Sequence, residues 1–237
     1  VGRRLRAERP ELPAILELGS TAAVFVDRGA DVARAAERTA WGGFGFAGQV
    51  CISVQHVSVH RSLAGEFRGR LLASLPAVGD PAEESTLLSA MISDRAASGL
   101  AAKIAATVSG GGRLVAGGPA NGNRHPATVI ESGEGSPLDR EEAFGPVVLV
   151  REYDDLGDEI ARRNRGGSTI QTGYFGDDPE RFLAAVRTGG AVVGDVPTVR
   201  FDALPYGGIG PDDEGREAPS VVVPTLTTPF PVLRVVG

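Results

Sequence analysis

Residues 22–60 read AAVFVDRGADVARAAERTAWGGFGFAGQVCISVQHVSVH, and this stretch decides the fold class. Its first five residues form a short apolar run that is typical of a strand. Residues 31 to about 41 begin with an Asp and have Ala-rich faces, which predicts a helix. Residues 54–60 alternate in the manner of a second strand. A strand, a helix and another strand in this order favour a parallel sheet that is covered by helices.

The same alternation continues along the rest of the chain. An opening helix ends at Arg9-Pro10, and further helices are predicted at 62–75, 93–109, 154–163 and 178–187. Further strands are predicted at 14–18, 113–115, 127–130, 147–150 and 191–193. Residues 221–236 are rich in Val, Thr and Pro, which favours an extended terminal arm over a helix. We therefore expect an α/β domain over residues 1–220, with a mostly parallel sheet flanked by helices, followed by an arm at 221–237.

The composition narrows the kinds of partner that the chain can have. Of its 237 residues 42% are hydrophobic, enough for a buried core, and its net charge is −6 without any long basic cluster. This charge argues against nucleic acid or an anionic membrane as the principal partner. No apolar run approaches the roughly 20 residues of a membrane span, so a cytoplasmic setting is the simplest expectation. One Cys and three scattered His give no metal-ligand spacing.

Cys51 is the only cysteine, and it lies in the segment FAGQVCIS at residues 46–53. A lone cysteine is usually a small buried hydrophobe. Here the thiol follows a Gly-Gln pair between a helix and a strand, which favours a nucleophile. Glu17 lies upstream in an otherwise apolar segment and is the candidate base, because desolvation makes a carboxylate more basic. The alternative for Glu17 is a solvated carboxylate at a strand edge.

Five short motifs occur in an order and approximate spacing that together cover nearly the whole chain. They are Glu17-Leu18-Gly19-Ser20, Gly48-Gln49-Val50-Cys51, Glu141-Glu142-Ala143-Phe144-Gly145-Pro146-Val147, Pro205-Tyr206-Gly207-Gly208 and Gly215-Arg216-Glu217. On these motifs the chain resembles the catalytic half of the aldehyde dehydrogenase superfamily. The resemblance implies that family's α/β catalytic-domain fold, a small aldehyde as substrate, and NAD or NADP as cofactor.

The resemblance also implies a catalytic role for two residues. Cys51 would attack the aldehyde as a thiolate and form a thiohemiacetal and then a thioester. Glu17 would activate the water that releases the carboxylic acid. The backbone N–H of Cys51 would be one donor to the negative charge that develops on the carbonyl oxygen.

Other residues would bind rather than react. The resemblance implies that Glu142 hydrogen-bonds the nicotinamide ribose, that Phe144 packs beside the nicotinamide, and that Leu18 and Gly19 also contact the cofactor. The alternatives for Glu142 and Phe144 are a loop acid and a core aromatic. Arg200 follows the turn at residues 194–198 and is a candidate for binding an anionic group of the substrate; its alternative is a surface salt bridge.

The family's coenzyme-binding half has no counterpart in the sequence. No strand, glycine-rich loop and helix for a dinucleotide precede the catalytic region. Residues 1–13 resemble the end of the coenzyme-binding region. We therefore expect the chain to be a portion of a larger enzyme, with the cofactor held mainly by a region outside it. Ser20 and Gly194 depart from the family pattern, which has glycine and asparagine at these places.

Three functions compete at this point. The first is the catalytic portion of an NAD(P)-dependent aldehyde dehydrogenase that oxidises an aldehyde to a carboxylic acid. The second is a semialdehyde dehydrogenase that passes the acyl group to coenzyme A, against which Glu17 argues because no hydrolytic base is then needed. The third is a non-catalytic structural or oligomerisation module with the same fold. The resemblance implies that the arm at 221–237 pairs with a neighbouring subunit in a homodimer or homotetramer.

Overall fold

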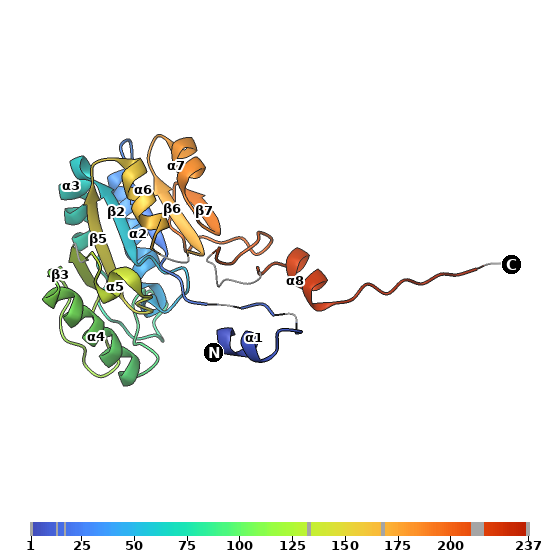
Figure 1. Cartoon of the computed structure of the whole chain (residues 1–237). Coiled ribbons are helices and arrows are strands. Elements are labelled where there is room, and N and C mark those ends of the chain that lie inside the picture. The colour runs from blue at the N-terminus through green and yellow to red at the C-terminus, as the bar shows by residue number, and fades with distance from the viewer. Residues whose placement is uncertain are drawn as a thin grey trace.

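A single sheet organises the chain, seen here in a computed structural model that describes residues 2–12, 14–16, 18–131, 134–166, 169–209 and 216–235. Within these residues seven strands pair in the order β3-β4-β5-β2-β1-β6-β7 (Figure 1). The β3–β4 pair is antiparallel and the other five pairs are parallel. The strands are β1 (Ala23–Val26), β2 (His56–His60), β3 (Arg113–Ala116), β4 (Thr128–Glu131), β5 (Val147–Tyr153), β6 (Gln171–Phe175) and β7 (Gly190–Val193).

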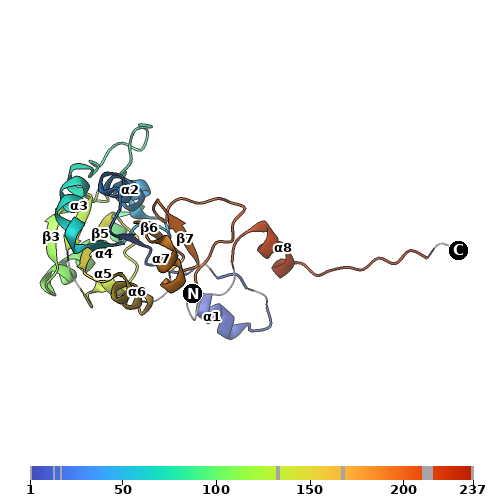
Figure 2. The same cartoon turned by 90° about the horizontal axis from the view of Figure 1, so that it is seen from above.

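Helices cover both faces of the sheet. Seen from above, α2 and α3 lie on one side of the strands and α6 and α7 on the other (Figure 2). The helices are α1 (Gly2–Glu8), α2 (Val32–Phe44), α3 (Arg61–Ala73), α4 (Asp94–Ser109), α5 (Pro137–Arg140), α6 (Leu156–Asn164), α7 (Pro179–Ala185) and α8 (Pro219–Leu226), with a 3-10 turn at Gly45–Gly48. Aspartate side chains cap the N-termini of α2, α6 and α7, so the sequence marks where these helices begin.

Strand β1 shows why both layers are needed. All four of its residues are buried, as in parallel strands that are covered on both faces. Val24 and Val26 join the large core under α2, α3 and α4, whereas Ala23 and Phe25 join a second core under α6 and α7. The Phe25 ring lies 5.4 Å from the ring of Phe182 on α7. The alternation along one short strand therefore ties the two helical layers to a common sheet.

The predicted fold class is confirmed, and individual elements need correction. The prediction of a strand at 14–18 is wrong for residues 14–16 and 18, which form no regular element. Leu16 and Leu18 instead contact α1, since a Cβ on Gly2 would lie 3.3 Å from each of them. Strand β6 and helix α5 were not predicted.

The terminal arm begins as a helix, which corrects the prediction of an extended segment from residue 221. Helix α8 starts with Pro219 at its first turn, a position that suits proline. No described side chain of α8 is buried, and the chain then runs without regular structure to residue 235. Figure 1 shows this arm leading away from the sheet. None of the helices in the described residues combines the length and the apolar character that a membrane crossing requires.

Candidate active site

The candidate site lies at the edge of the sheet where the parallel strands begin. Gly19 precedes β1, Cys51 precedes β2 and Glu142 precedes β5. Because parallel strands begin at the same edge, the segments that lead into them come together there. Ligands of open α/β sheets usually bind at the opposite edge, where the strands end. This chain therefore gathers its predicted functional residues at the less common edge.

A buried amide joins the segments at this edge. The Gln55 Nε2 atom donates to the Ser20 carbonyl at 2.7 Å, and Gln55 Oε1 accepts from the Ala143 N–H at 2.6 Å. The Ser20 hydroxyl accepts from the Ile170 N–H at 3.2 Å, which adds the segment that leads into β6. Both Gln55 and Ser20 are buried, so water does not compete for these bonds. Side chains thus fix the relative positions of the segments before β1, β2, β5 and β6.

The loop before Cys51 has an unusual backbone. Phe46 and Ala47 have φ angles of 52° and 55°, in the left-handed region that non-glycine residues rarely adopt. Gly48 follows with a φ of 65°, and a Cβ at this position would lie only 2.2 Å from the Gly145 carbonyl oxygen. Only glycine allows this close approach between the cysteine loop and the loop before β5. Backbone strain of this kind persists where the surrounding structure imposes it, often at functional sites.

Cys51 itself lies in a tight turn. The Ser53 N–H donates to the Val50 carbonyl at 2.9 Å and closes the turn around the cysteine. The Ser53 hydroxyl lies within hydrogen-bonding distance of two carbonyls near the end of α2. It can donate to Gly42 or Gly43, each at 3.3 Å. The cysteine side chain is neither fully buried nor fully exposed. The turn therefore holds a partly accessible thiol between α2 and β2.

An aromatic side chain reaches the thiol from a distant part of the chain. The Tyr206 hydroxyl is hydrogen-bonded to Cys51 Sγ. The Arg200 guanidinium lies 4.1 Å from the centre of the Tyr206 ring and forms an ion pair with Glu217 at 3.2 Å. The loop after β7 thus contributes directly to the surroundings of the sulfur.

A second group of residues surrounds Glu142. Its Oε1 accepts from the Ser20 N–H at 3.3 Å, and its backbone carbonyl accepts from Lys103 at 2.8 Å. Burial raises the pKa of Glu142, while the Ser20 N–H and Lys103 act in the opposite direction. A Cβ on Gly19 would lie 3.1 Å from Glu142 Oε2, so this glycine leaves the carboxylate room. Phe144, two residues further along, is 43% exposed, so its ring is accessible to a ligand.

An apolar hollow opens beside the cysteine loop. Its volume is about 340 Å³, in the range of pockets that hold small molecules. Trp41, Phe46, Val50 and Leu87 supply apolar lining, and Thr198 supplies a hydroxyl. Val50 directly precedes the cysteine, so the hollow adjoins the cysteine loop.

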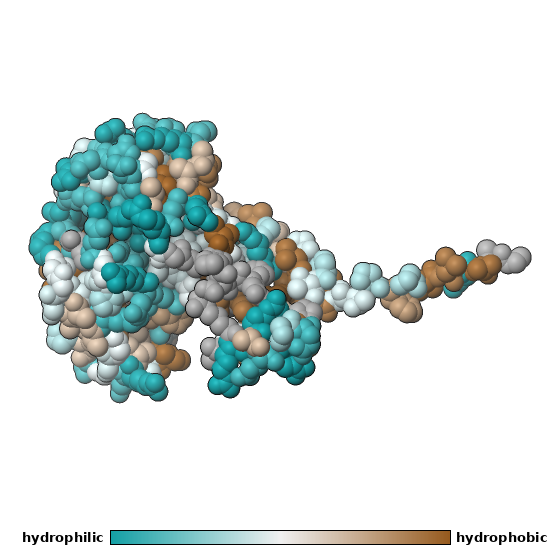
Figure 3. All heavy atoms as spheres, in the orientation of Figure 1, coloured by the Kyte–Doolittle hydropathy of each residue, from teal (hydrophilic) through white to brown (hydrophobic). Residues whose placement is uncertain are grey.

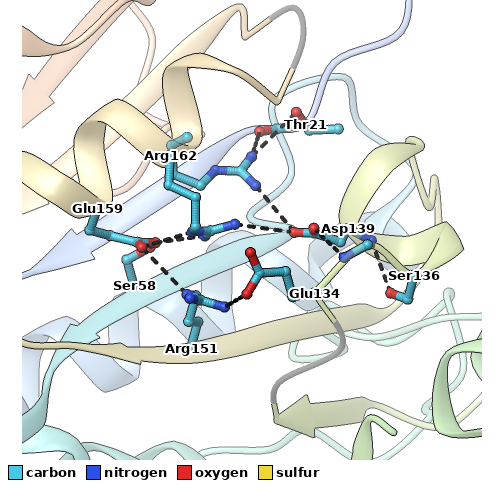
Figure 4. Close-up of polar contacts among 10 residues, drawn as sticks. Thr21, Ser58, Glu134, Ser136, Asp139, Arg151, Glu159 and Arg162 are labelled. Atoms are coloured by element: carbon cyan, nitrogen blue, oxygen red, sulfur yellow. Dashed lines mark hydrogen bonds and ion pairs between the residues drawn. The ribbon is translucent and has the colours of Figure 1, made fainter. Parts of the chain in front are cut away.

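A buried ionic network supports the site from the side of α6 (Figure 4). Arg163 Nη2 donates to the carbonyl and hydroxyl of Thr21, at 3.3 and 3.4 Å. The neighbouring Arg162 bridges Glu159 at 2.6 Å and Asp139 at 3.5 Å. Burial lowers the pKa of Arg163 to about 10, with Arg162 acting in the same direction and the two acids opposing it. Arg163 therefore stays charged at neutral pH and anchors the segment that leads into β1.

The predicted site residues fall into two adjoining groups. Cys51 and Arg200 share contacts with Tyr206, and the predicted alternative for Arg200, a salt bridge, is present. Gly19 and Glu142 lie side by side in the second group, and Leu18 is half-buried in the same segment. The contact of Gly48 with Gly145 and the cluster of Ile52, Ile170 and Tyr206 connect the two groups. Glu17, the predicted base, lies outside the described residues.

Tyr206 and Gln55 make contacts at the site that their sequence context did not predict. Tyr206 is the second residue of the Pro205-Tyr206-Gly207-Gly208 motif, and its hydroxyl is the sequence feature that could have indicated a polar role. Gln55 is a polar side chain in an apolar strand-like run, which is the pattern of a buried hydrogen-bonding group. In both cases the partner is remote in sequence, so only the fold shows the contact.

Comparison with known proteins identifies what the chain is similar to. The model of the aldehyde dehydrogenase family matches residues 1–227. The 3-sulfolactaldehyde dehydrogenase of Priestia aryabhattai is 30% identical over 233 residues, which are 96% of this chain and 49% of the relative. The lactaldehyde dehydrogenase of Methanococcus aeolicus is 29% identical over 85% of this chain and 44% of its own. The chain thus spans about half the length of the curated relatives it matches.

Solved structures show the same pattern. Aldehyde dehydrogenase 21 from Physcomitrella patens, in complex with its reaction product succinate, is 31% identical and superposes with a TM-score of 0.88 over 95% of this chain and 48% of its own. The glyceraldehyde-3-phosphate dehydrogenase GapN from Methanocaldococcus jannaschii, complexed with NADP, is 29% identical with a TM-score of 0.81 over 86% of this chain and 45% of its own.

Proposed function

The chain belongs to the aldehyde dehydrogenase family, and from this premise we propose that it is the catalytic portion of an NAD(P)-dependent aldehyde dehydrogenase that oxidises an aldehyde to a carboxylic acid. The observation that carries the proposal is the situation of Cys51. A partly accessible thiol lies in a tight turn beside an apolar hollow, at the edge where the segments before four strands meet.

Cys51 is the proposed nucleophile. Its thiolate attacks the aldehyde carbon, an S–C bond forms, and the carbonyl π electrons move to oxygen to give a thiohemiacetal. The Cys51 backbone N–H is one proposed donor to that oxygen. Loss of hydride from the thiohemiacetal carbon, as the oxygen electrons re-form the carbonyl, leaves a thioester on Cys51. Water that is deprotonated by the proposed base Glu17 then displaces the sulfur and releases the acid.

Glu142, Phe144, Leu18 and Gly19 are the proposed contacts with the nicotinamide cofactor, which when bound supplies the hydride acceptor. Their arrangement fits such a group, because a partly buried carboxylate adjoins Gly19 and an exposed aromatic ring follows it two residues later in the chain. The carboxylate of Glu142 would accept hydrogen bonds from ribose hydroxyls. The rest of the cofactor would be held by a region outside this chain.

The proposed substrate is a small aldehyde that enters through the apolar hollow. We propose that Arg200 contacts an anionic group on it, since the guanidinium is partly exposed and lies over the ring that touches the sulfur. Two relatives support this chemistry by their names: one is a 3-sulfolactaldehyde dehydrogenase, and the solved structure of another is a complex with the reaction product succinate.

We also propose that the arm at residues 221–235 packs on another subunit of a homodimer or homotetramer. The observation that favours it is the exposure of its apolar side chains, among them Phe230 at 87% and Leu233 at 90%. Exposed apolar surface of this kind marks interaction sites.

Hydrolysis of 4-nitrophenyl acetate by the purified chain tests the nucleophile without any cofactor. The Cys51 thiolate would displace 4-nitrophenolate to form an acetyl thioester, which water then cleaves. We expect Cys51→Ala to lower the rate of nitrophenolate release by about 100-fold or more, because the nucleophile is lost. Ser74→Ala, at the remote end of α3, is the matched control and should leave the rate unchanged.

The other possible results separate the competing functions. Equal rates for the parent chain and Cys51→Ala would contradict the nucleophile. No release by a chain that circular dichroism shows to be folded would favour a structural module, unless adding a separately purified coenzyme-binding half restores the reaction. Acetyl-coenzyme A as the product when coenzyme A is added, with no free acetate in its absence, would favour the acylating alternative.

A further inference from the structure

Tyr206 is the one described side chain with a polar contact to the sulfur of Cys51. The two residues lie 155 positions apart in sequence, and the Tyr206 hydroxyl meets Cys51 Sγ within hydrogen-bonding distance. Tyr206 is 5% exposed, and its ring packs with Ile52 and Ile170 in a small apolar cluster beside the cysteine. A hydroxyl held in an apolar surrounding next to a nucleophile is a strong hydrogen-bond donor to a charged sulfur.

Contacts with Glu217 and Arg200 hold the Tyr206 ring in place. The backbone N–H of Tyr206 donates to the Glu217 carbonyl at 2.8 Å, and the Glu217 N–H donates to the Tyr206 carbonyl at 2.7 Å. Arg200 lies over the ring at 4.1 Å and is in turn held by the Glu217 carboxylate at 3.2 Å. A cation over the ring withdraws electron density from it, and this makes the phenol hydroxyl a better donor.

We propose that Tyr206 is a catalytic residue whose hydroxyl donates a hydrogen bond to the Cys51 thiolate, and that Arg200 strengthens this donor through the ring. The inference deepens the proposed function, because it names the group that stabilises the attacking form of the nucleophile. The hydroxyl also directs the sulfur, since a donor at a fixed position favours one side-chain rotamer of the cysteine.

Tyr206 keeps its proton throughout this step. When the sulfur attacks the carbonyl carbon, an S–C bond forms and the negative charge passes from sulfur to oxygen. The hydrogen bond to sulfur then weakens, because the sulfur of the adduct is neutral. Tyr206 thus acts on the thiolate before attack, and Glu17 keeps the separate role of base in the hydrolysis of the thioester.

Alkylation of the single cysteine tests the proposal in the purified chain. Cys51 is the only thiol, so the rate of iodoacetamide consumption, followed by mass spectrometry, reports one group. Tyr206→Phe removes the hydroxyl and keeps the ring, the apolar cluster and the Arg200 contact. If the bond favours the thiolate tenfold, its loss lowers the thiolate fraction at pH 7 tenfold and raises the intrinsic reactivity of the remaining thiolate about threefold. We expect alkylation about threefold slower at pH 7.

The pH dependence of the alkylation rate distinguishes loss of a hydrogen bond to the thiolate from a change in access to the sulfur. At high pH, once ionisation of the thiol no longer limits the rate, Tyr206→Phe should react as fast as the parent or up to about threefold faster. A variant that merely alters access to the sulfur would change the rate by the same factor at both pH values, and that result would overturn the proposal. Faster alkylation at pH 7 would also overturn it, because the hydroxyl would then shield the sulfur.

Two further variants complete the experiment. Tyr174→Phe removes a buried hydroxyl that contacts Asp27 at the far end of β6, and it should leave the alkylation profile unchanged. Arg200→Met should move the profile in the same direction as Tyr206→Phe but by a smaller factor, whereas no change would overturn the role of Arg200 in strengthening the donor. These results are independent of ester hydrolysis, so failure of the proposed function and failure of this inference are distinguishable.

Discussion

At the scale of single residues, Gly48 decides the path of the cysteine loop. Its φ of 65° is accessible to glycine, and a methyl group there would meet the Gly145 carbonyl oxygen at 2.2 Å. We expect Gly48→Ala to lower the free energy of unfolding by about 3 kcal/mol, from left-handed strain together with displacement of the neighbouring loop. Urea denaturation followed by circular dichroism measures this change.

A second glycine provides the control for this substitution. Gly65 is exposed within α3, and nothing lies within 4 Å of the Cβ that alanine would add. Gly65→Ala should therefore raise the free energy of unfolding by up to about 1 kcal/mol through helix propensity. Equal stability of Gly48→Ala and the parent chain would contradict the loop geometry.

Arg200 is predicted to determine how strongly the enzyme prefers an aldehyde with a negative charge. In the enzyme completed by its coenzyme-binding half, Arg200→Met should raise KM for an aldehyde with a carboxylate about tenfold, because an exposed guanidinium contributes about 1.4 kcal/mol to binding an anion. KM for a neutral aldehyde of the same size should change less than twofold. A decrease in kcat shared by both aldehydes would report the contact with Tyr206 instead.

The control for this prediction is another exposed arginine. Arg34 on α2 pairs with Asp195 at 3.0 Å and has no hydrogen bond or ion pair with the predicted site residues that the structure describes, so Arg34→Met should leave both KM values unchanged. An equal rise in KM for the charged and the neutral aldehyde in Arg200→Met would mean that Arg200 shapes the hollow without recognising charge.

At the scale of elements, the sequence predicted the helices and strands that have a clear local pattern, such as a capping residue or an apolar run. Helix α2 follows a capping Asp31, and β1 is an unbroken apolar run, so both lie close to their predicted positions. Strand β6 was missed because its sequence QTGYF contains a glycine and two polar residues. Its pairing with β1 and β7 makes it a strand, and this is tertiary context that no local pattern contains.

The arm shows the reverse error. Val-rich sequence favours strands only where a sheet edge is available, and the intrinsic penalty of valine in a helix is only a few tenths of a kcal/mol to about 0.6 kcal/mol. With Pro219 at its first turn, α8 forms over residues that strand propensity alone would leave extended. Strand propensity therefore placed the boundary between the domain and the arm near residue 220. It gave the wrong conformation for residues 221–226, which are helical.

The same limits apply to the candidate site. Motifs nominated Cys51, Gly19 and Glu142 as candidates, because their residue types suit the chemistry and their spacing is distinctive. Tyr206 and Gln55 act through contacts with partners that are 155 and 88 residues away, respectively, and such pairs are set by the order of strands in the sheet. Residue type can nominate a nucleophile, whereas its hydrogen-bond donor becomes visible only in the fold.

At the scale of the whole molecule, exposed apolar side chains are concentrated in two regions. One is the site region, where Phe46 is 81% and Phe201 68% exposed, and the other is the arm. Figure 3 shows the contrast between the largely hydrophilic surface over the upper sheet domain and the apolar residues along the arm. Surfaces of this kind are normally covered by protein. The proposed coenzyme-binding region would cover the first of these surfaces, and the proposed neighbouring subunit would cover the arm.

The arm is therefore predicted to hold the subunits together. Its apolar side chains Phe230, Val232, Leu233 and Val235 are each at least 79% exposed, and burial against a neighbouring subunit would contribute roughly 1.5–3 kcal/mol for each large side chain. We expect deletion of residues 227–237 to convert a dimer or tetramer into a monomer, measured by size-exclusion chromatography with light scattering. Val108→Lys on α4, which removes a partly exposed apolar group elsewhere, should leave the mass unchanged. An unchanged mass after the deletion would mean that other surfaces hold the subunits together, and a monomeric parent chain would mean that the arm alone does not assemble them.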